Sequence, residues 1–388
     1  MGLAAAKIHL VFVLGTRPEA IKLAPVILVA RRRTCDFRVT VINTGQHQDL
    51  CCGALAPFGI SPEFDLGIMD VRQTPTDVLA RTLERLPSVL GSASPDIVLV
   101  QGDTSTALGA ALCAHHLKIP VGHVEAGLRT DRRYCPFPEE MNRRLISPLA
   151  SYHFAPTERA REHLLREGIP DSSVLVTGNS VVDALYWLRD KAARPAGLPT
   201  QEFSGRVLLL TCHRRENHGA GIRSICLAVR DIVTQCPDVH VVFPVHPNPN
   251  VAQDVFDLLR DQPRILLIPP VDYPELVWLL QKATMVLTDS GGIQEEAPSF
   301  GKPVLVLREV TERPEGIEAG VARLVGTDRR SIVEATLQLL ENSDAYAAMS
   351  KAVNPYGDGH AAQRILDFVA RQVHSPSSMP VASGGMAS

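Results

Sequence analysis

Short apolar runs alternate with longer amphipathic stretches along the first half of the chain. The runs are rich in Val, Ile and Leu and predict buried strands at 8–14, 37–43, 96–101, 121–125 and 152–155. The stretches carry apolar residues at helical spacing and predict helices at 18–32, 77–90, 104–117, 138–149 and 158–167. This alternation of strand and helix is typical of a doubly wound parallel sheet.

The alternation restarts after segment 191–205, whose Pro, Ala and Gly residues predict a loop or linker. In this second half we expect strands at 207–211, 239–244, 265–268, 285–288 and 304–307. Helices are expected at 221–235, 251–260, 273–281, 292–300 and 360–372. The predicted fold class is therefore α/β, with two Rossmann-like doubly wound parallel-sheet domains and a ligand site in the cleft between them.

Composition narrows the class of protein further. Of the 388 residues, 45% are hydrophobic but only 5% are aromatic, so aliphatic side chains must build the cores. The net charge of −3 argues against nucleic-acid binding driven by overall charge. The eight cysteines form no Cys-x-x-Cys pair, and we expect them to be reduced, small apolar residues. Without 18 continuous apolar residues we expect no transmembrane helix, and hence a cytoplasmic protein.

Polar residues follow each predicted strand of the first half. After the first strand, Pro18 begins a helix and Arg17 offers a forked donor that suits a phosphate. Asp103 follows a later strand, Glu125 stands at the end of the next one, and Glu139 stands at a helix start, where an acid also suits the helix dipole. Carboxylates that lie close together acquire different pKa values, so one can act as acid and another as base. Such a set suits removal and return of a proton at carbon.

The second half supplies cations and main-chain donors. His213 and His246 follow strands and could titrate or bind phosphate, but neither has a partner at metal-ligand spacing, so we expect no metal. The segment 289–296 opens a helix with Ser-Gly-Gly, which can cradle a diphosphate, and its acidic pair could accept from ribose hydroxyls. Arg313 offers a further anion contact. Together these features favour a sugar nucleotide as ligand.

Taken together, these motifs resemble those of the non-hydrolysing UDP-N-acetylglucosamine 2-epimerases. The resemblance runs in order from about residue 7 to about residue 370. The strings that carry it are Gly-Thr-Arg-Pro-Glu-Ala-Ile-Lys (15–22), Gln-Gly-Asp-Thr (101–104), His-Val-Glu-Ala-Gly-Leu-Arg-Thr (123–130), Pro-Glu-Glu-Met-Asn-Arg (138–143), His-Arg-Arg-Glu-Asn (213–217), Asp-Ser-Gly-Gly-Ile-Gln-Glu-Glu (289–296) and Thr-Glu-Arg-Pro-Glu (311–315).

The resemblance implies a GT-B architecture. Its N-terminal Rossmann-like domain would span 1–185 and be joined by the C-terminal helix 360–373, while 186–359 would form the UDP-binding domain. The tail at 375–388 lies outside the resemblance, and its composition predicts disorder. The implied enzyme is an isomerase of polysaccharide biosynthesis that interconverts UDP-GlcNAc and UDP-ManNAc without NAD or metal. It would eliminate UDP to a bound 2-acetamidoglucal and then add UDP back. A homodimer is also implied.

The resemblance also assigns roles to individual residues. The implied catalytic residues are Asp103, Glu125, Glu139 and His213. The implied contacts to the UDP-sugar are Arg17, Lys22, His246, Ser290, Gly291, Gly292, Glu296 and Arg313. A second UDP-GlcNAc, acting as an allosteric activator, would lie near Gln46, Arg72, Arg214 and His246. The run 48–52 departs from the family pattern beside Gln46, which affects the allosteric assignment more than the chemistry.

Other functions stay open on the sequence alone. A 2-epimerase of a modified UDP-sugar, such as a UDP-2,3-diacetamido-uronic acid, shares most of these motifs. A hydrolysing 2-epimerase would release free ManNAc, but the strings follow the non-hydrolysing pattern throughout. A GT-B glycosyltransferase would need an acceptor groove and would not need three acids around C1 and C2. A UDP-sugar sensor would bind without turnover and would not need the implied catalytic set.

Overall fold

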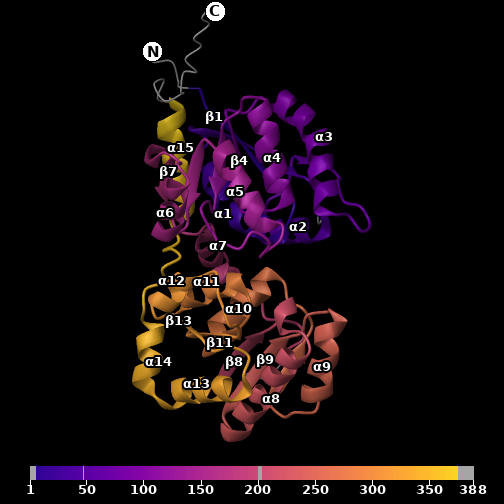
Figure 1. The fold of residues 1–388 in the computed structure, drawn as a ribbon, viewed down its shortest axis with the longest axis vertical. Helices are drawn as coiled ribbons and strands as arrows, with labels where there is room; N and C mark the ends of the chain where they lie inside the picture. The colour runs from indigo at the N-terminus through magenta and orange to yellow at the C-terminus, as the bar shows by residue number, and fades with distance from the viewer. Residues whose placement is uncertain (1–5, 47, 200–202, 375–388) are drawn as a thin grey trace, which may run out of the picture. The chain divides into compact units, whose positions relative to one another are not determined.

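The computed structural model describes residues 6–46, 48–199 and 203–374, which fall into two compact units (Figure 1). The first unit ends at Ser180 and takes in the chain again from His360; the second runs from Val181 to Gly359. This border precedes the 185/186 boundary expected from the sequence, and the Tyr186 hydroxyl already donates to the main chain of Ser299. The tail at 375–388, expected to be disordered, lies outside the described residues.

The first unit is a parallel sheet whose described strands follow the order β3-β2-β1-β4-β5-β6-β7. Its strands are β1 (Ile8–Leu14), β2 (Phe37–Asn43), β3 (Phe64–Asp65), β4 (Ile97–Gln101), β5 (Val121–Val124), β6 (Tyr152–Ala155) and β7 (Val174–Val176). Its helices are α1 (Arg17–Arg32), α2 (Gln48–Leu55), α3 (Pro75–Ala93), α4 (Ser105–His116), α5 (Glu139–Leu149), α6 (Glu158–Arg166) and α15 (Ala361–His374). The last of these packs on α1, and its Phe368 contacts the rings of Tyr152 and Phe154.

The second unit repeats this topology, with the described strand order β10-β9-β8-β11-β12-β13. Its strands are β8 (Arg206–Thr211), β9 (Val239–Pro244), β10 (Ile265–Ile268), β11 (Met285–Thr288), β12 (Val304–Val306) and β13 (Ala322–Leu324). Its helices are α7 (Ser180–Leu188), α8 (Ala220–Gln235), α9 (Pro249–Leu259), α10 (Tyr273–Lys282), α11 (Gly291–Glu296), α12 (Pro314–Glu318), α13 (Arg329–Glu341) and α14 (Ser343–Ser350). Two doubly wound parallel sheets confirm the predicted fold class.

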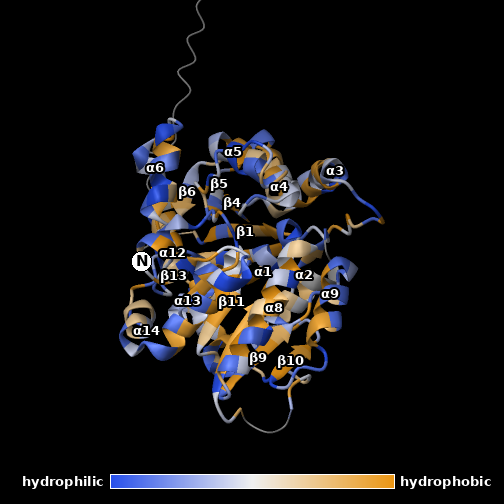
Figure 2. Cartoon of the chain, turned by 60° about the horizontal axis from the view of Figure 1, so that its bottom comes forward, coloured by the Kyte–Doolittle hydropathy of each residue, from blue (hydrophilic) through white to orange (hydrophobic). Residues whose placement is uncertain are grey.

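Aliphatic side chains build both cores, as the low aromatic content requires. Every residue of β1 and of β4 is buried. In the second unit, Leu208, Val241 and Leu287 from neighbouring strands pack in one cluster with Ile225 of α8. Figure 2 shows hydrophobic residues concentrated on strands such as β1 and β9 and hydrophilic residues on outlying helices such as α6. Strands buried on both faces leave the polar chemistry to the loops at their ends.

Local capping signals explain where several helices begin. Thr74 and Asp77 exchange side-chain and main-chain hydrogen bonds at the start of α3, and Pro75 is its first residue. Asp272 and Glu275 do the same for α10. The sequence analysis missed β3, β7 and β13, because strands of two or three residues carry too short a pattern to detect.

In each sheet the strand order reverses at one place, between β1 and β4 in the first unit and between β8 and β11 in the second. Ligands of open α/β sheets bind outside the carboxyl ends of the strands at such a switch point. The segments that follow these four strands therefore position the candidate site residues.

Candidate functional site

A buried carboxylate ties together the loops that follow β1 and β4. Glu19, in the first turn of α1, accepts hydrogen bonds at Oε2 from the N–H of Gly15 (3.0 Å) and from the N–H and hydroxyl of Thr16 (both 2.8 Å). Its Oε1 accepts from the Thr104 hydroxyl at 2.6 Å. Complete burial raises the pKa of Glu19 to about 7, although these hydrogen bonds act to lower it. The contacts join the segment that leads to Arg17 with the segment that contains Asp103.

Asp103 and Glu139 form one acidic pair at this edge of the first sheet. Arg143, on α5, binds Asp103 Oδ2 through Nη2 and through Nε (3.0 Å), while Asn142 donates to the Asp103 carbonyl at 2.9 Å. Glu139 is the first residue of α5. Burial raises the pKa of Glu139, and the charge of Asp103 raises it further, while Arg143 lowers it. The structure therefore brings these two predicted acids together and gives them different electrostatic environments.

Glu125, the third predicted acid, has a different set of partners. Its Oε2 forms an ion pair with Lys22 of α1 and accepts from the Asn179 side chain at 3.0 Å. The main chain of Glu125 is left-handed, with φ of 65°, which non-glycine residues seldom adopt. Such conformations persist where the surrounding structure enforces them and often mark functional sites. Two residues on, Gly127 has φ of 90°, and a Cβ there would lie 2.2 Å from the Ala160 carbonyl oxygen.

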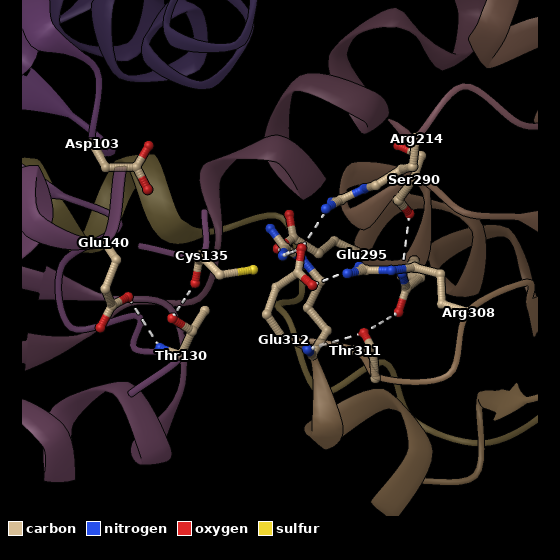
Figure 3. Close-up of polar contacts among 12 residues, drawn as sticks. Asp103, Thr130, Cys135, Glu140, Arg214, Ser290, Glu295, Arg308, Thr311 and Glu312 are labelled. Carbon is tan, nitrogen blue, oxygen red and sulfur yellow. Dashed lines mark hydrogen bonds and ion pairs between the residues drawn. The ribbon is translucent and has the colours of Figure 1, made fainter. Parts of the chain in front are cut away.

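Glu140 is a structural acid, although it stands beside Glu139 in the same motif. It is completely buried and accepts from the Thr130 N–H at 3.1 Å (Figure 3). It also pairs with Arg143 and Arg144. The Thr130 hydroxyl donates to the Cys135 carbonyl at 2.6 Å. These contacts hold the segment after β5 against α5, and they anchor Arg143 through Nη1, while its Nε and Nη2 bind Asp103.

Gln46 and Arg72, predicted to lie near an allosteric ligand, belong to the first unit. Gln46 accepts from the Thr106 hydroxyl at 2.8 Å, and its carbonyl accepts from the Gln73 side chain at 2.9 Å. Arg72 is exposed and has a left-handed main chain, with φ of 61°. The neighbouring His47 lies outside the described residues.

In the second unit, buried Asp289 organises the loop that carries His213. Asp289 accepts from the main-chain N–H groups of His213 (3.0 Å) and Arg214 (2.9 Å), from the Asn217 amide (3.0 Å) and from Cys212 Sγ (3.1 Å). His213 Nδ1 lies 3.4 Å from Asp289 Oδ1. Burial lowers the pKa of His213, and Asp289 opposes that shift.

The ring of His246 stacks on the ring of His213, with 5.8 Å between centroids and 21° between planes. His246 itself is exposed and accepts from the Asn248 N–H at 3.2 Å. The structure thus brings together two histidines that lie in separate motifs of the sequence, after β8 and after β9.

Arg313 lies across the start of α11. Its Nε donates to Glu295 at 2.8 Å and its Nη1 contacts Glu312 Oε1 at 2.9 Å. A Cβ on Gly291 would lie 2.8 Å from Arg313 Nη1 and 2.9 Å from its Cζ, so only glycine lets the guanidinium come this close. Ser290 and Gly292 flank Gly291, and Glu296 is the last residue of α11 and is buried.

Glu312 is the centre of a cluster of arginines (Figure 3). Its Oε1 accepts from Arg214 at 2.9 Å as well as from Arg313, and its Oε2 accepts from Arg308 at 2.6 Å. Burial alone would raise the pKa of Glu312, but the three guanidinium groups lower it to about 2. Arg214, predicted as an allosteric contact, and Arg313, predicted as a UDP contact, therefore share one carboxylate.

Four charged residues lie inside the recognised motifs, but the sequence predicted no role for them: Glu19, Arg143, Asp289 and Glu312. Each is a charged residue that contacts a predicted site residue or its loop. The available signal was a charged residue inside a motif at a strand end. Among the residues that the structure describes, no three or more His, Cys, Asp or Glu side chains are grouped so that they could hold a metal ion. Likewise, none of the described helices is long and apolar enough to span a bilayer.

Comparisons with known proteins agree with these motifs. The model of a family described as UDP-N-acetylglucosamine 2-epimerase matches residues 29–370. An Escherichia coli K12 protein named UDP-N-acetylglucosamine 2-epimerase is 49% identical over 363 residues, which cover 92% of this chain and 96% of that protein. The structure of UDP-GlcNAc 2-epimerase from Neisseria meningitidis bound to UDP-GlcNAc has a TM-score of 0.87 and 44% identity over 94% of this chain and 100% of that one. The enzyme from Methanocaldococcus jannaschii in complex with UDP-GlcNAc and UDP has a TM-score of 0.77 and 34% identity, covering 94% and 100%.

Proposed function

The chain belongs to the UDP-N-acetylglucosamine 2-epimerase family, and we propose that it interconverts UDP-GlcNAc and UDP-ManNAc by inverting C2 of the sugar. It is accordingly an isomerase. The observation that carries the proposed chemistry is the arrangement of Asp103, Glu139 and Arg143 at the switch point of the first sheet. Two carboxylates in unequal environments can divide the roles of proton acceptor and proton donor.

The proposed reaction is an elimination followed by an addition. One carboxylate takes the C2 proton, the electrons of the C2–H bond form a C1=C2 double bond, and UDP leaves with the electrons of the C1–O bond. The product of this step is UDP and 2-acetamidoglucal. UDP then adds back at C1 while C2 receives a proton on the opposite face. Each step moves a proton and a leaving group and none transfers a hydride, so the proposed route uses no nicotinamide.

We assign the proton chemistry to Asp103, Glu125 and Glu139 of the first unit. Lys22 is ion-paired with Glu125 and Arg143 with Asp103, so each of these two carboxyl groups has a fixed cationic partner. The pKa of Glu139 is raised by burial, which supports a group that can hold and release a proton nearer to neutral pH.

We assign the nucleotide to Ser290, Gly291, Gly292, Glu296 and Arg313 of the second unit, with Arg17 as a further phosphate contact. A C2 proton beside an acetamido group is poorly acidic, so the departing diphosphate must be strongly stabilised. Main-chain N–H groups at a helix start and a fixed guanidinium provide that stabilisation without rearrangement. We assign to His213, close to buried Asp289, a proton or hydrogen bond for the leaving group.

The proposal extends to partners and location. We propose a homodimer and a second, activating UDP-GlcNAc near Gln46, Arg72, Arg214 and His246; both rest on the family resemblance. The sharing of Glu312 by Arg214 and Arg313 supports communication between the activating and reacting ligands. We also propose a cytoplasmic location. The five buried cysteines support it, since Cys51, Cys113, Cys212, Cys226 and Cys236 are thiols that pack as small apolar residues.

Proton NMR of the purified protein with UDP-GlcNAc in heavy water tests the proposed function. New UDP-ManNAc signals with deuterium at C2 would establish inversion through cleavage of the C2–H bond. Free ManNAc with UDP would indicate a hydrolysing enzyme instead. Unchanged UDP-GlcNAc, in a preparation that binds UDP, would overturn the assignment and favour a modified UDP-sugar as substrate. The Asp103→Asn variant is the matched control, because it should bind UDP and leave the C2 proton in place.

A further inference from the structure

Two loops of the first unit carry residues that the proposed function needs: the loop after β1 leads to Arg17, and the loop after β4 contains Asp103. We propose that Glu19 is a positioning residue, whose buried carboxylate locks these two loops together and so sets the place of Asp103. This inference rests on the proposed function, because Asp103 is a reacting group only there. Glu19 itself touches neither Asp103 nor Arg17 in the hydrogen bonds described above.

The carboxylate of Glu19 forms hydrogen bonds both within its own loop and to a loop that is distant in the sequence. A glutamate in the first turn of a helix normally caps that helix by accepting from the residue that precedes it. Glu19 does this through Thr16, but its Oε1 also accepts from Thr104, which lies 85 positions away in the sequence. A helix cap does not require that second bond. It joins the two loops where the strand order of the sheet reverses.

The Thr104 hydroxyl is both a donor to Glu19 and the cap of α4. It donates to Glu19 and accepts from the Ala107 N–H at 2.9 Å, which caps α4. Asp103 directly precedes Thr104, and its carbonyl accepts from Asn142. The main chain around Asp103 is therefore held on one side by α5 and on the other by Glu19. Gly102, just before Asp103, is also bonded to β5 through the Val124 carbonyl, so loss of the Glu19 contact would loosen the loop on the Thr104 side of Asp103.

The loop after β1 is tightly packed at Gly15. A Cβ on Gly15 would lie 2.1 Å from the Thr44 hydroxyl oxygen and 2.8 Å from that of Thr106. The loop therefore has little room to move as a body against its neighbours. It offers Glu19 a fixed base, from which the carboxylate reaches Thr104.

Glu19→Gln distinguishes the contacts of Oε2 with the loop after β1 from the contact of Oε1 with Thr104. The amide oxygen can replace Oε2 and keep its three donors on the loop after β1. The amide NH2 then faces Thr104. In the wild-type protein the Thr104 hydroxyl donates to Oε1, and it cannot donate to an NH2 group, so this hydrogen bond is lost unless the hydroxyl reorients. The variant should therefore loosen the loop of Asp103 while it preserves the loop that leads to Arg17. We expect kcat to fall about tenfold, the scale of a small displacement of a reacting group, with KM and UDP affinity within about twofold of wild type.

A matched control is Glu63→Gln. Glu63 also bridges two elements, because it accepts from the Val41 N–H and pairs with Arg31, but it contacts neither loop. Its kcat should stay at the wild-type level even if its melting temperature falls. A second pair of variants guards against misfolding of Glu19→Gln. Thr104→Val removes the hydroxyl and should lower kcat as Glu19→Gln does, whereas Thr104→Ser keeps the hydroxyl and should restore kcat.

Hydrogen–deuterium exchange provides a readout that does not depend on turnover. Glu19→Gln should speed exchange in peptides that cover residues 102–107, and Glu63→Gln should leave these peptides unchanged. Wild-type kcat in both Glu19→Gln and Thr104→Val, or unchanged exchange at 102–107, would overturn the positioning role. If the wild-type protein fails to epimerise UDP-GlcNAc, the proposed function falls, but the exchange result still decides whether Glu19 holds the loop.

Discussion

Both units bury a glutamate beside their candidate site residues, yet the two glutamates have opposite pKa shifts. In the first unit, burial raises the pKa of Glu19 to about 7, and its partners are neutral N–H and O–H donors. In the second, burial acts in the same direction on Glu312, but three arginines lower its pKa to about 2. The difference comes from the partners, since neutral donors offset only part of the desolvation cost and cations more than offset it.

The comparison indicates how the units divide the work. Burial raises the pKa of Glu19 to about 7 and also raises the pKa of Glu139, so carboxyl groups of the first unit keep a proton to higher pH than an exposed glutamate does. In the second unit, Arg214, Arg308 and Arg313 are held in place around Glu312. A fixed set of charges suits a diphosphate, because it need not rearrange when the leaving group develops its charge. Variants of both units can therefore test whether proton chemistry belongs to the first unit and nucleotide binding to the second.

The largest effect should come from the acids of the first unit. Asp103→Asn, Glu125→Gln and Glu139→Gln should each lower kcat by at least about 100-fold, the usual contribution of an acid or base group. UDP affinity, measured by isothermal titration calorimetry, should survive in all three, because the nucleotide is assigned to the other unit. Near-wild-type turnover in all three variants would contradict the assignment of proton chemistry to the first unit.

Asp289→Asn should have the next largest effect. A single amide oxygen cannot serve all the donors that now point at the carboxylate, so the free energy of unfolding should fall by about 2 kcal/mol. Displacement of His213 should lower kcat about tenfold. Urea unfolding and steady-state kinetics measure the two changes. Asp231→Asn is the control, because its pair with Arg329 is partly exposed and should contribute little. An equal loss in both variants would show that Asp289 has no special role.

Gly291→Ala should weaken UDP binding about fivefold, a smaller effect because Arg313 can swing part of the way aside. Catalytic turnover at saturating substrate should change less than the affinity does. Gly221→Ala is the control, since a Cβ there meets only ordinary contacts of 3.6 Å or more. Calorimetric titration with UDP decides the matter. Unchanged affinity in Gly291→Ala would remove Arg313 from the proposed nucleotide site.

The smallest effects should be opposite slopes of stability against pH. The folded pKa of Glu19 lies above the ordinary glutamate value of 4.5, so its contribution to the free energy of unfolding falls as pH rises from 4.5 to about 7. The folded pKa of Glu312 lies below 4.5, so its contribution rises as pH increases from about 2 to 4.5. Glu19→Gln should remove the first slope and Glu312→Gln the second. Melting temperatures across these pH windows measure both, and slopes equal to wild type would contradict the comparison.

Much of the fold could be predicted from the chain, because long buried strands and Ala- or Leu-rich helices have strong periodic patterns. The strands expected at 37–43, 152–155 and 239–244 agree with β2, β6 and β9. The helices α13 and α14 were missed, even though Ile332, Ala335 and Leu339 repeat at helical spacing. Short edge strands such as β3 form only because a neighbouring strand offers hydrogen-bond partners, which local sequence does not reveal.

By itself, the sequence determined the α/β class and the positions of acids, histidines and glycines at the strand ends, since these follow from local patterns of polarity and turn chemistry. The partners of each acid, in contrast, follow from the tertiary structure. It made Glu140 a buried anchor of Arg143 and Arg144, and it joined Glu19 to Thr104 across the switch point. The physical reason is that burial and partner charge set the pKa of a carboxyl group. Both depend on residues that are distant in the chain and become neighbours only in the fold.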